Sequence, residues 1–551
     1  MTKEDAKVVI VGAGPTGLSL AIELGSRGIA CVVVEQNDRV GYAPRAKTTN
    51  VRTRTHLRRW CIAEHLADAS PFGVGYPSNV LFVTQLAGPE LAKIENASNC
   101  SPVRSDLYPE HGQWVPQYKL EEVLRAHAAT LPAVELRFST EFISADQDAE
   151  GVTIVVRDRQ TEEKSKCRAD FLVGADGARS AVRELIGASM EGQYGLSSNY
   201  NIVFRAPGLS TAHRHGPATM YWQVNPAAPS LIGPMDRDDV WFFMPTRLKE
   251  GVTLTDREAA ELIRTATGID LDYQILSRDA WVASSLIANR YSKGRIFLAG
   301  DACHLHPPFG GYGMNMGVSD AVDLGWKLAA VLEGWGGPVL LNSYEAERRP
   351  VHQQVIDEAQ LNHKILSNEL WQDGLDADTE AAEMLRRVVG NHIVEQKTRE
   401  FHTLGTVLGL CYATSPIIAP DDVEEGQARP AEQGYIASSR PGCLAPHAWR
   451  DNDLSIYDLF GSGFTLLAHE DAHADMAIRE AQASGVPLTL LTITAEEQPL
   501  YPLPLTLVRP DQHVAWRGKA WPSGLLGQVT GWIGSVPSEE NSMLAQGELG
   551  K

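Results

Sequence analysis

A glycine-rich turn near the start of the sequence limits most strongly what this chain can fold into. The β-branched run 7–12 leads into Gly12-Ala13-Gly14-Pro15-Thr16-Gly17, and a helical pattern and a second apolar run, 30–34, follow. In such a unit the first glycine makes a tight turn, the second admits a pyrophosphate, and the third lets helix and strand pack closely. Glu35 ends the second run, where it can hold a ribose hydroxyl. The pattern predicts a Rossmann-like dinucleotide-binding domain.

A second glycine-rich segment lies far along the chain, between Arg295 and Leu328. An apolar run ends at Gly300-Asp301, and then Pro307-Pro308 and Gly310-Gly311-Tyr312-Gly313 precede a helical pattern. Glycines let a backbone approach a flat ligand, and a helix N-terminus offers unpaired N–H groups. An acid at a strand end can accept hydrogen bonds from ligand hydroxyls. An ordinary strand–loop–helix connection needs fewer glycines, so the segment predicts a second part of the ligand site.

A third strand end carries an acid and a glycine. The buried-strand pattern 169–174 stops just before Asp176-Gly177, and a helix start follows. An Asp-Gly turn is common on its own. Because this chain already contains a dinucleotide motif, Asp176 becomes a candidate for the same site.

Length and composition limit the class of protein. A chain of 551 residues is too long for one core, so two or three domains are expected. The net charge of −20 argues against nucleic-acid or anionic-membrane binding, and no apolar stretch approaches the roughly 20 residues of a membrane helix. The N-terminus lacks the apolar core of a signal peptide, and the seven cysteines include no C-x-x-C pair. We therefore expect a cytoplasmic enzyme with free thiols.

Changes of pattern along the chain predict its domains. From about 199 to 281, strand-like runs alternate with turns, as in an antiparallel sheet inserted into a nucleotide-binding fold. The stretch from Pro420 to Arg440 is the clearest linker. The expected division is a dinucleotide-binding domain (1–75, 105–198 and 282–370), a substrate domain (76–104 and 199–281), a helical connection and linker (371–439), and a C-terminal domain (440–551).

Three signatures together resemble one family. They are the Gly12–Gly17 motif, the run Asp176-Gly177-x-x-Ser180-x-Val182-Arg183, and Gly300-Asp301-x-x-His304 with Pro307-Pro308 and Gly313-Met314-Asn315. Over residues 5–365 the chain resembles the class A flavoprotein aromatic hydroxylases, the family of p-hydroxybenzoate hydroxylase and phenol hydroxylase. Its tail resembles the thioredoxin-like C-terminal domain of the larger members. Cys443 has no partner at C-x-x-C spacing, so no thiol redox role is expected there. The implied fold class is α/β (α+β overall).

The resemblance implies a set of FAD contacts. The motif residues Gly12, Gly14, Pro15, Thr16 and Gly17 would meet the pyrophosphate. Glu35 would meet the ribose, Asp301 the ribityl chain, and Pro308 the reactive edge of the flavin. The remaining implied cofactor positions are Arg45, Gln117, Asp176, Gly311, Gly313, Met314 and Asn315. Arg45 directly follows a proline in a basic stretch, where NADH or NADPH would dock transiently.

The resemblance also implies a reaction. The enzyme would use NAD(P)H and O2 to hydroxylate a phenolic ring through a flavin C4a-hydroperoxide. The alternative is a related flavoprotein dehydrogenase or reductase that inserts no oxygen. No nucleic-acid or membrane partner is expected, and the chain would be a monomer or homodimer.

Candidate substrate residues come from the inserted sheet. They are His213, Tyr221, Trp222 and Phe243, and His215, Tyr221, Arg45 and Pro308 are the candidate catalytic residues. Each aromatic residue, taken singly, is more often a core residue than a ligand contact. The pair His304 and His306 lacks the further ligands of a metal site, so no metal is expected.

Overall fold

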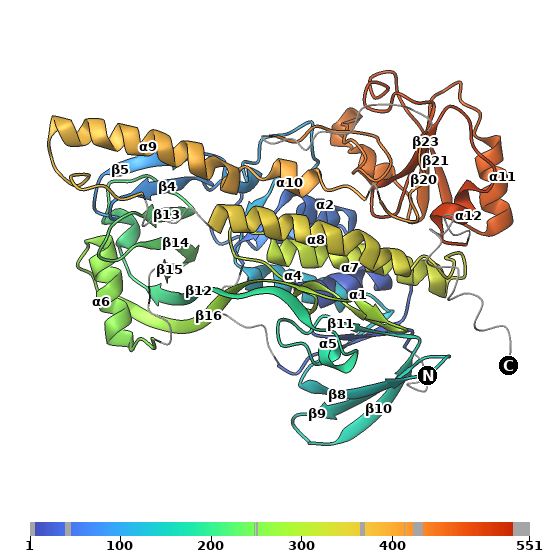
Figure 1. Ribbon diagram of the computed structural model, residues 1–551, viewed down its shortest axis with the longest axis horizontal. Helices are drawn as coiled ribbons and strands as arrows, with labels where there is room; N and C mark the ends of the chain where they lie inside the picture. The colour runs from blue at the N-terminus through green and yellow to red at the C-terminus, as the bar shows by residue number, and fades with distance from the viewer. Residues whose placement is uncertain are drawn as a thin grey trace.

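A six-stranded sheet forms the centre of the molecule (Figure 1). The computed structural model describes residues 6–38, 46–246, 248, 252–363, 370–412, 414–421 and 434–532. All neighbouring strands of this sheet are parallel except for the antiparallel edge strand β17. Their order is β17 (Ser292–Lys293), β18 (Ile296–Leu298), β11 (Phe171–Gly174), β1 (Val8–Val11), β2 (Cys31–Val34) and β7 (Val134–Arg137). The predicted Rossmann-like core is confirmed.

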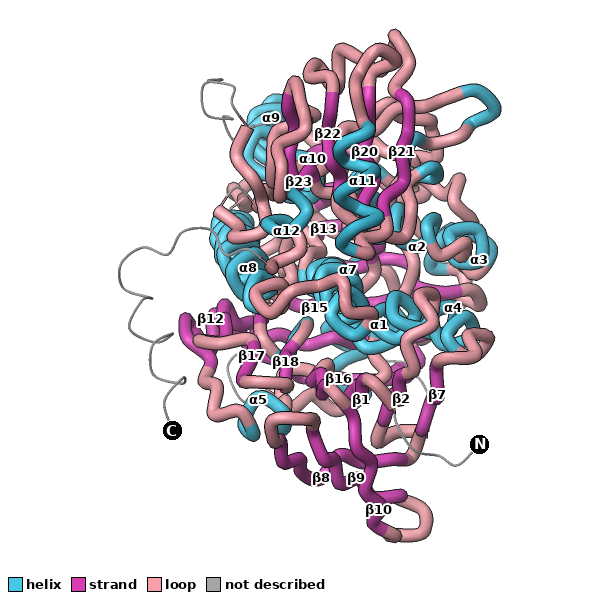
Figure 2. The backbone as a smooth tube through the Cα atoms, turned by 90° about the vertical axis from the view of Figure 1, so that its right-hand side faces the viewer, coloured by secondary structure: helices cyan, strands magenta, loops and turns pink. Residues whose placement is uncertain are grey.

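Layers cover both faces of this sheet. In Figure 2, helices α1 (Pro15–Gly25), α4 (Gln117–Ala128) and α7 (Gly313–Leu332) lie above it. A three-stranded sheet of β8 (Thr140–Gln147), β9 (Val152–Asp158) and β10 (Lys164–Ala169) lies below. Buried residues of β9, β1 and β11 belong to one apolar core. Because burial on both faces excludes water, the central strands are continuous runs of Val, Ile and Leu.

The inserted sheet has eight strands. Its order is β19 (His304–Leu305), β16 (Gln274–Ala288), β12 (Met190–Arg205), β15 (Val240–Pro245), β14 (Ser230–Asp236), β13 (Met220–Gln223), β4 (Val80–Val83) and β5 (Glu90–Ile94). The expected antiparallel pairing holds for every pair except β13 with β4, which is parallel. Helix α6 (Asp256–Thr267) packs on one face, and α9 (Glu380–Phe401) on the other.

Shorter elements connect these layers. Strand β3 (Thr48–Thr49) pairs with β6 (Gln113–Trp114), so the segment after the first glycine motif is joined to the segment before α4. The remaining helices of this part are α2 (Val51–Arg59), α3 (Ala63–Asp68), α5 (Ala181–Leu185), α8 (Asn342–His363) and α10 (Leu404–Leu408). Much of the predicted linker, residues 422–433, lies outside the described residues.

The C-terminal domain is a small α/β unit. Its elements run β20 (Phe464–Ala468), α11 (Asp475–Ser484), β21 (Leu488–Thr492), β22 (Leu505–Val508), β23 (Val514–Gly518) and α12 (Leu525–Val529), in the sheet order β21-β20-β22-β23. Trp326 of α7 packs against Phe464, which joins the two cores. Cys443 does have a thiol neighbour, because the Sγ of Cys411 lies 3.2 Å away. The sequence spacing hid this pair, since Cys411 precedes the linker.

A buried ionic network crosses the same boundary. Arg509 of the C-terminal domain bonds both oxygens of Glu347 on α8, at 2.6 and 2.9 Å, and Asp323 on α7 at 3.0 Å. It also bonds Asp511 at 2.7 Å. Lys327 bonds Asp323 at 2.8 Å and Glu347 at 2.6 Å. All five side chains are at most 3% exposed. Burial raises the pKa of the Asp323 carboxyl. The network therefore ties α7 and α8 to the C-terminal domain.

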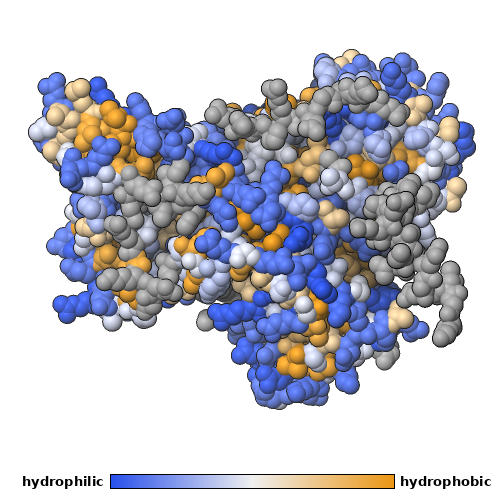
Figure 3. Space-filling view, in the orientation of Figure 1, coloured by the Kyte–Doolittle hydropathy of each residue, from blue (hydrophilic) through white to orange (hydrophobic). Residues whose placement is uncertain are grey.

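The surface is mainly hydrophilic in the view of Figure 3, with apolar areas at the end where α9 lies and on the β8–β10 sheet. Met384 and Val388, one helical turn apart on α9, are 65% and 64% exposed. Within the described residues no helix combines the length and the apolar character needed to cross a membrane.

Candidate active site

The first glycine motif forms the turn between β1 and α1. Gly12 has φ of +105°, and a Cβ there would lie 2.3 Å from the carbonyl oxygen of Ala175. A Cβ on Gly17 would lie 1.9 Å from the oxygen of Gly12. Gly14 differs, because a Cβ there would meet nothing within 4 Å. It is also the N-cap of α1, and no side chain caps this helix. Gly12 and Gly17 thus allow the backbone to pack closely. Gly14 leaves open space in front of the free N–H groups at the start of α1, as a pyrophosphate requires.

Glu35 lies at the end of β2, against this turn. One oxygen accepts a hydrogen bond from the Ala13 N–H at 3.0 Å. The other accepts from the backbone and side-chain nitrogens of Asn37, at 2.9 and 2.8 Å. These bonds fix the carboxylate beside the turn, where the sequence placed a ribose contact.

The two glycine-rich segments meet in space. A Cβ on Gly300 would lie 2.6 Å from the Thr16 Oγ1, and a Cβ on Gly317 of α7 would lie 2.2 Å from the same atom. Thr16 therefore fits between the strand end that carries Asp301 and the first turns of α7. The distant segments form one continuous site, as one extended dinucleotide requires.

The loop before α7 is open at one end and anchored at the other. Pro308 is exposed, and a Cβ on Gly313, the first residue of α7, would meet nothing within 4 Å. Asn315 is buried, and its amide donates to the oxygens of Thr48 and Gly311, at 2.9 and 2.7 Å. Its side chain thus holds the loop, and the predicted cofactor contact of Asn315 concerns its backbone N–H. Met314 stands beside it in the same helical turn.

Two further predicted contacts flank the site. Gln117 donates its backbone N–H to the Ala46 oxygen at 3.0 Å and accepts from the Ala46 N–H at 3.2 Å through its side chain. This places Gln117 against the residue that follows Arg45, which itself lies outside the described residues. Asp176 follows β11, and its carboxylate accepts from Ser180 and from the Val182 N–H. Burial raises the pKa of Asp176.

The face of the inserted sheet toward α9 meets the loop of Pro308. Phe309 belongs to one apolar cluster with Trp222, Phe242 and, at its edge, Trp114. The rings of Trp114 and Phe242 lie 6.2 Å apart. Of the predicted substrate residues, Trp222 is on this face. Phe242 was not predicted, although it adjoins Phe243 in the sequence.

The other predicted substrate residues lie on the opposite face, under α6. Tyr221 and Phe243 pack there with Ile263 of α6. The ring of His213 lies 5.1 Å from that of Tyr221, and His215 lies 6.3 Å from it. The Tyr221 hydroxyl donates to the Gly216 oxygen at 2.7 Å. Burial raises the pKa of Tyr221 and lowers that of His213 to about 4. These four side chains do not come together with Pro308.

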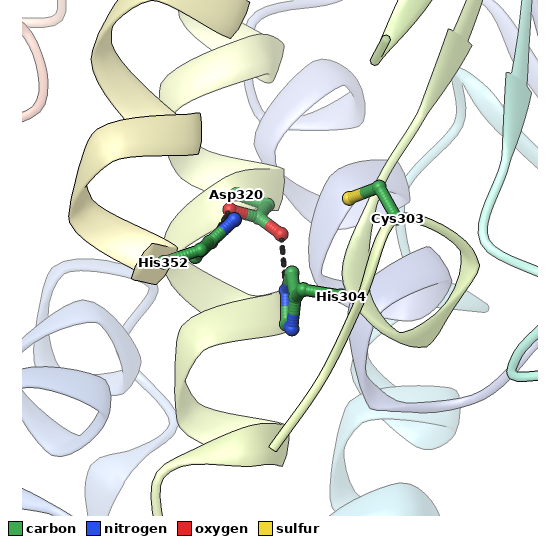
Figure 4. Close-up of side chains that lie close together, drawn as sticks. All are labelled: Cys303, His304, Asp320 and His352. Carbon is green, nitrogen blue, oxygen red and sulfur yellow. Dashed lines mark hydrogen bonds and ion pairs between the residues drawn. The ribbon is translucent and has the colours of Figure 1, made fainter. Parts of the chain in front are cut away.

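A buried polar cluster joins α7 and α8 to the segment of Cys303 and His304 (Figure 4). Asp320 of α7 accepts from the Gly300 N–H at 3.0 Å and from Arg348 Nε at 2.7 Å. His304 and His352 each lie 2.9 Å from its oxygens. Although burial opposes ionisation, His352 and Arg348 hold the pKa of Asp320 well below its usual range. The cluster anchors the strand end that carries Asp301.

The same cluster contains four residues of the types that bind metals. Donor atoms of Cys303, His304, Asp320 and His352 lie within 4.8 Å of one another. The Arg348 guanidinium already neutralises the carboxylate, and burial keeps the Cys303 thiol protonated by raising its pKa. In the described contacts these donors form a hydrogen-bond network around Asp320.

The chain fits FAD. Gly14 and Gly313 leave open space at the N-termini of α1 and α7, and no side chain caps either helix. Such termini bind anionic groups. In FAD these groups would be the pyrophosphate and the flavin ring, which accepts electrons.

Comparison with known proteins agrees with this site. Residues 5–359 match a family model described as FAD binding domain, and residues 438–536 match one described as aromatic-ring hydroxylase, C-terminal. The chain is 33% identical to tetracenomycin B2 monooxygenase-dioxygenase of Streptomyces olivaceus, over 94% of this chain and 96% of that protein. It is 31% identical to phenol 2-monooxygenase of Pseudomonas sp. (strain EST1001), over 94% and 90%.

A solved structure agrees as well. The flavin-dependent monooxygenase PieE, in complex with FAD and substrate, is 31% identical, with a TM-score of 0.85 over 97% of this chain and all of that chain. The glycine turn, the loop before α7 and the C-terminal unit all lie within the matched ranges. The chain belongs to the class A flavoprotein aromatic hydroxylases.

Proposed function

We propose that this enzyme hydroxylates a phenolic ring that lies between the loop of Pro308 and the aromatic face of the inserted sheet. The observation that carries the proposal is the apolar cluster in which Phe309 joins Trp222 and Phe242. Relatives named for a phenol and for tetracenomycin B2, at 31% and 33% identity, support an aromatic substrate.

The protein's own groups would position the reactants. Bound FAD supplies the redox chemistry with NAD(P)H and O2. The uncapped N-terminus of α7 favours negative charge on the flavin ring beside it. The apolar face keeps water from the reacting carbon and orients the ring. NADH or NADPH would dock transiently from the side of Gln117.

Oxygen transfer separates this proposal from a dehydrogenase. We expect a panel of monocyclic and fused-ring phenols to include one that stimulates NAD(P)H oxidation by the holoenzyme. With 18O2, the product of that phenol should carry one labelled oxygen per turnover, measured by mass spectrometry. A product formed without label would support the dehydrogenase instead. If no phenol stimulates NAD(P)H oxidation, the phenolic substrate is wrong.

Two neighbouring phenylalanines test which face of the sheet meets the substrate. Phe242→Leu removes aromatic area beside the proposed site, and we expect KM for the phenol to rise about 5- to 10-fold, equivalent to about 1–1.4 kcal/mol. Phe243→Leu makes the same change under α6 and should leave kcat/KM within about twofold, while both variants lose similar stability. Steady-state kinetics with thermal unfolding checks this. A larger kinetic effect at Phe243 would place the substrate on the other face.

A further inference from the structure

Lys47 lies where the loop of Pro308 meets the inserted sheet. Its oxygen accepts a hydrogen bond from the Val115 N–H at 2.9 Å. The next residue, Thr48, pairs with Trp114 and accepts from Asn315 through its backbone. A Cβ on Gly311 would lie 3.5 Å from the Thr48 Cβ. The backbone of Lys47 is therefore fixed beside the loop of Pro308.

The amine of Lys47 points onto the aromatic face. Its Nζ lies 4.0 Å from the centre of the Phe242 ring. Phe242 in turn lies beside Trp114 and shares a cluster with Phe309, which follows Pro308. A cation over a ring face is held by the ring's quadrupole, which fixes the position of the ammonium without neutralising it.

Lys47 is half-buried, and it differs from Lys327 and Lys397, which are the fully buried lysines among the described residues. Lys327 bonds two carboxylates and Lys397 bonds Glu400 at 2.9 Å. Among the residues that the structure describes, no carboxylate or other hydrogen-bond acceptor contacts the Lys47 amine. Burial lowers the pKa of Lys47 to about 8. Partial desolvation of an amine without a counter-ion costs free energy, and an anionic ligand over Phe242 would offset that cost.

We propose that the Lys47 amine binds the phenolic oxygen of the substrate and holds it as the phenolate. This inference rests on the proposed function, because it assumes a phenol on this face. A neutral phenol transfers its O–H proton to the neutral amine, and a phenolate enters beside the ammonium. Both routes give the same ion pair, with no atom gained or lost. The negative charge makes the ring carbons ortho and para to the oxygen electron-rich, as hydroxylation requires.

The test compares a phenol with its methyl ether, which has the same ring but no ionisable hydroxyl. The probe is the phenol that best stimulates NAD(P)H oxidation by the wild-type holoenzyme, and its Kd is measured from the change in flavin absorbance. Lys47→Met should weaken binding of the phenol about 10- to 100-fold, as expected for a buried charge-assisted hydrogen bond. Binding of the ether should change less than about threefold. Lys47→Arg keeps the charge and should restore most of the phenol affinity.

Controls separate this role from a structural one. Lys93→Met changes an exposed lysine on β5 of the same sheet and should alter neither Kd. If Lys47→Met weakens phenol and ether equally, or weakens neither, the inference is wrong while the hydroxylase function stands. If no phenol stimulates the wild-type enzyme, the proposed function fails first, and the inference fails with it.

Discussion

A Gly14→Ala variant should fold normally and lose most of its FAD. Gly14 has φ of −74°, which alanine adopts without strain, and the added methyl group would meet no protein atom within 4 Å. It would instead stand in front of the N-terminus of α1, where the second glycine of such a motif admits the pyrophosphate. We expect FAD affinity to fall at least about 100-fold, or about 3 kcal/mol. Quenching of flavin fluorescence during titration of the apoprotein measures this.

Two other glycines give the matched controls. Gly75→Ala also meets no protein atom within 4 Å, in an exposed loop, and should leave FAD affinity unchanged. Gly17→Ala puts a methyl group 1.9 Å from the Gly12 oxygen and should destabilise the apoprotein itself. Apoprotein stability of Gly14→Ala should change by no more than about 1 kcal/mol, because the gain from a less flexible unfolded chain opposes the loss of glycine at the N-cap. Unchanged FAD affinity in Gly14→Ala would mean that the pyrophosphate does not approach this turn.

The geometry of the first glycine turn was predictable because glycine spacing encodes backbone geometry. The distances between Gly12, Gly14 and Gly17 along the chain specify a turn, an open approach and a close packing contact, and each needs only local sequence. The second segment was predictable for the same reason. Its contact with the first through Thr16 followed only from the assumption that one ligand spans both.

The face of the inserted sheet that meets the loop of Pro308 was not predictable from the strand sequences. Side chains alternate between the two faces of a sheet, so neighbours such as Phe242 and Phe243 point in opposite directions. Strand β15 is apolar at every position from Val240 to Met244, because α6 covers one face and α9 the other. Without polar alternation, the strand sequence contains no signal for which face meets the loop of Pro308. The predictions of Tyr221 and Phe243 chose the face under α6.

The sequence also did not predict the polar contacts between residues that are far apart along the chain. Asp320, Arg348 and His352 come from two helices and meet only because α7 and α8 pack together. The thiols of Cys411 and Cys443 meet across a segment that includes the linker. None has a spacing that predicts a partner, since such contacts depend on tertiary packing. Among the side chains that contact Asp320, only His304 was predicted to matter, because it belongs to a recognisable run of residues.

An Arg509→Met variant should lose about 3–5 kcal/mol of stability, because it leaves several carboxylates buried without their cation. Arg509 is fully buried and bonds Asp323, Glu347 and Asp511. After its removal, Lys327 is left to neutralise Asp323 and Glu347, and Asp511 keeps His513, 3.3 Å away. Urea unfolding followed by tryptophan fluorescence measures the loss, since Trp326 and Phe464 lie at the same boundary.

A second change separates lost attraction from lost packing. Arg509→Met with Glu347→Met removes one of the stranded carboxylates, so the double variant should be less destabilised than the sum of the two single variants, by about 1–3 kcal/mol. Arg479→Met, on the exposed surface of α11, should change stability by no more than about 0.5 kcal/mol. Because α7 carries Asp323 and begins directly after the loop of Pro308, Arg509→Met should also release FAD at a lower temperature. Stability losses that simply add would mean that the network contributes packing alone, and that the C-terminal domain does not hold α7 through charge.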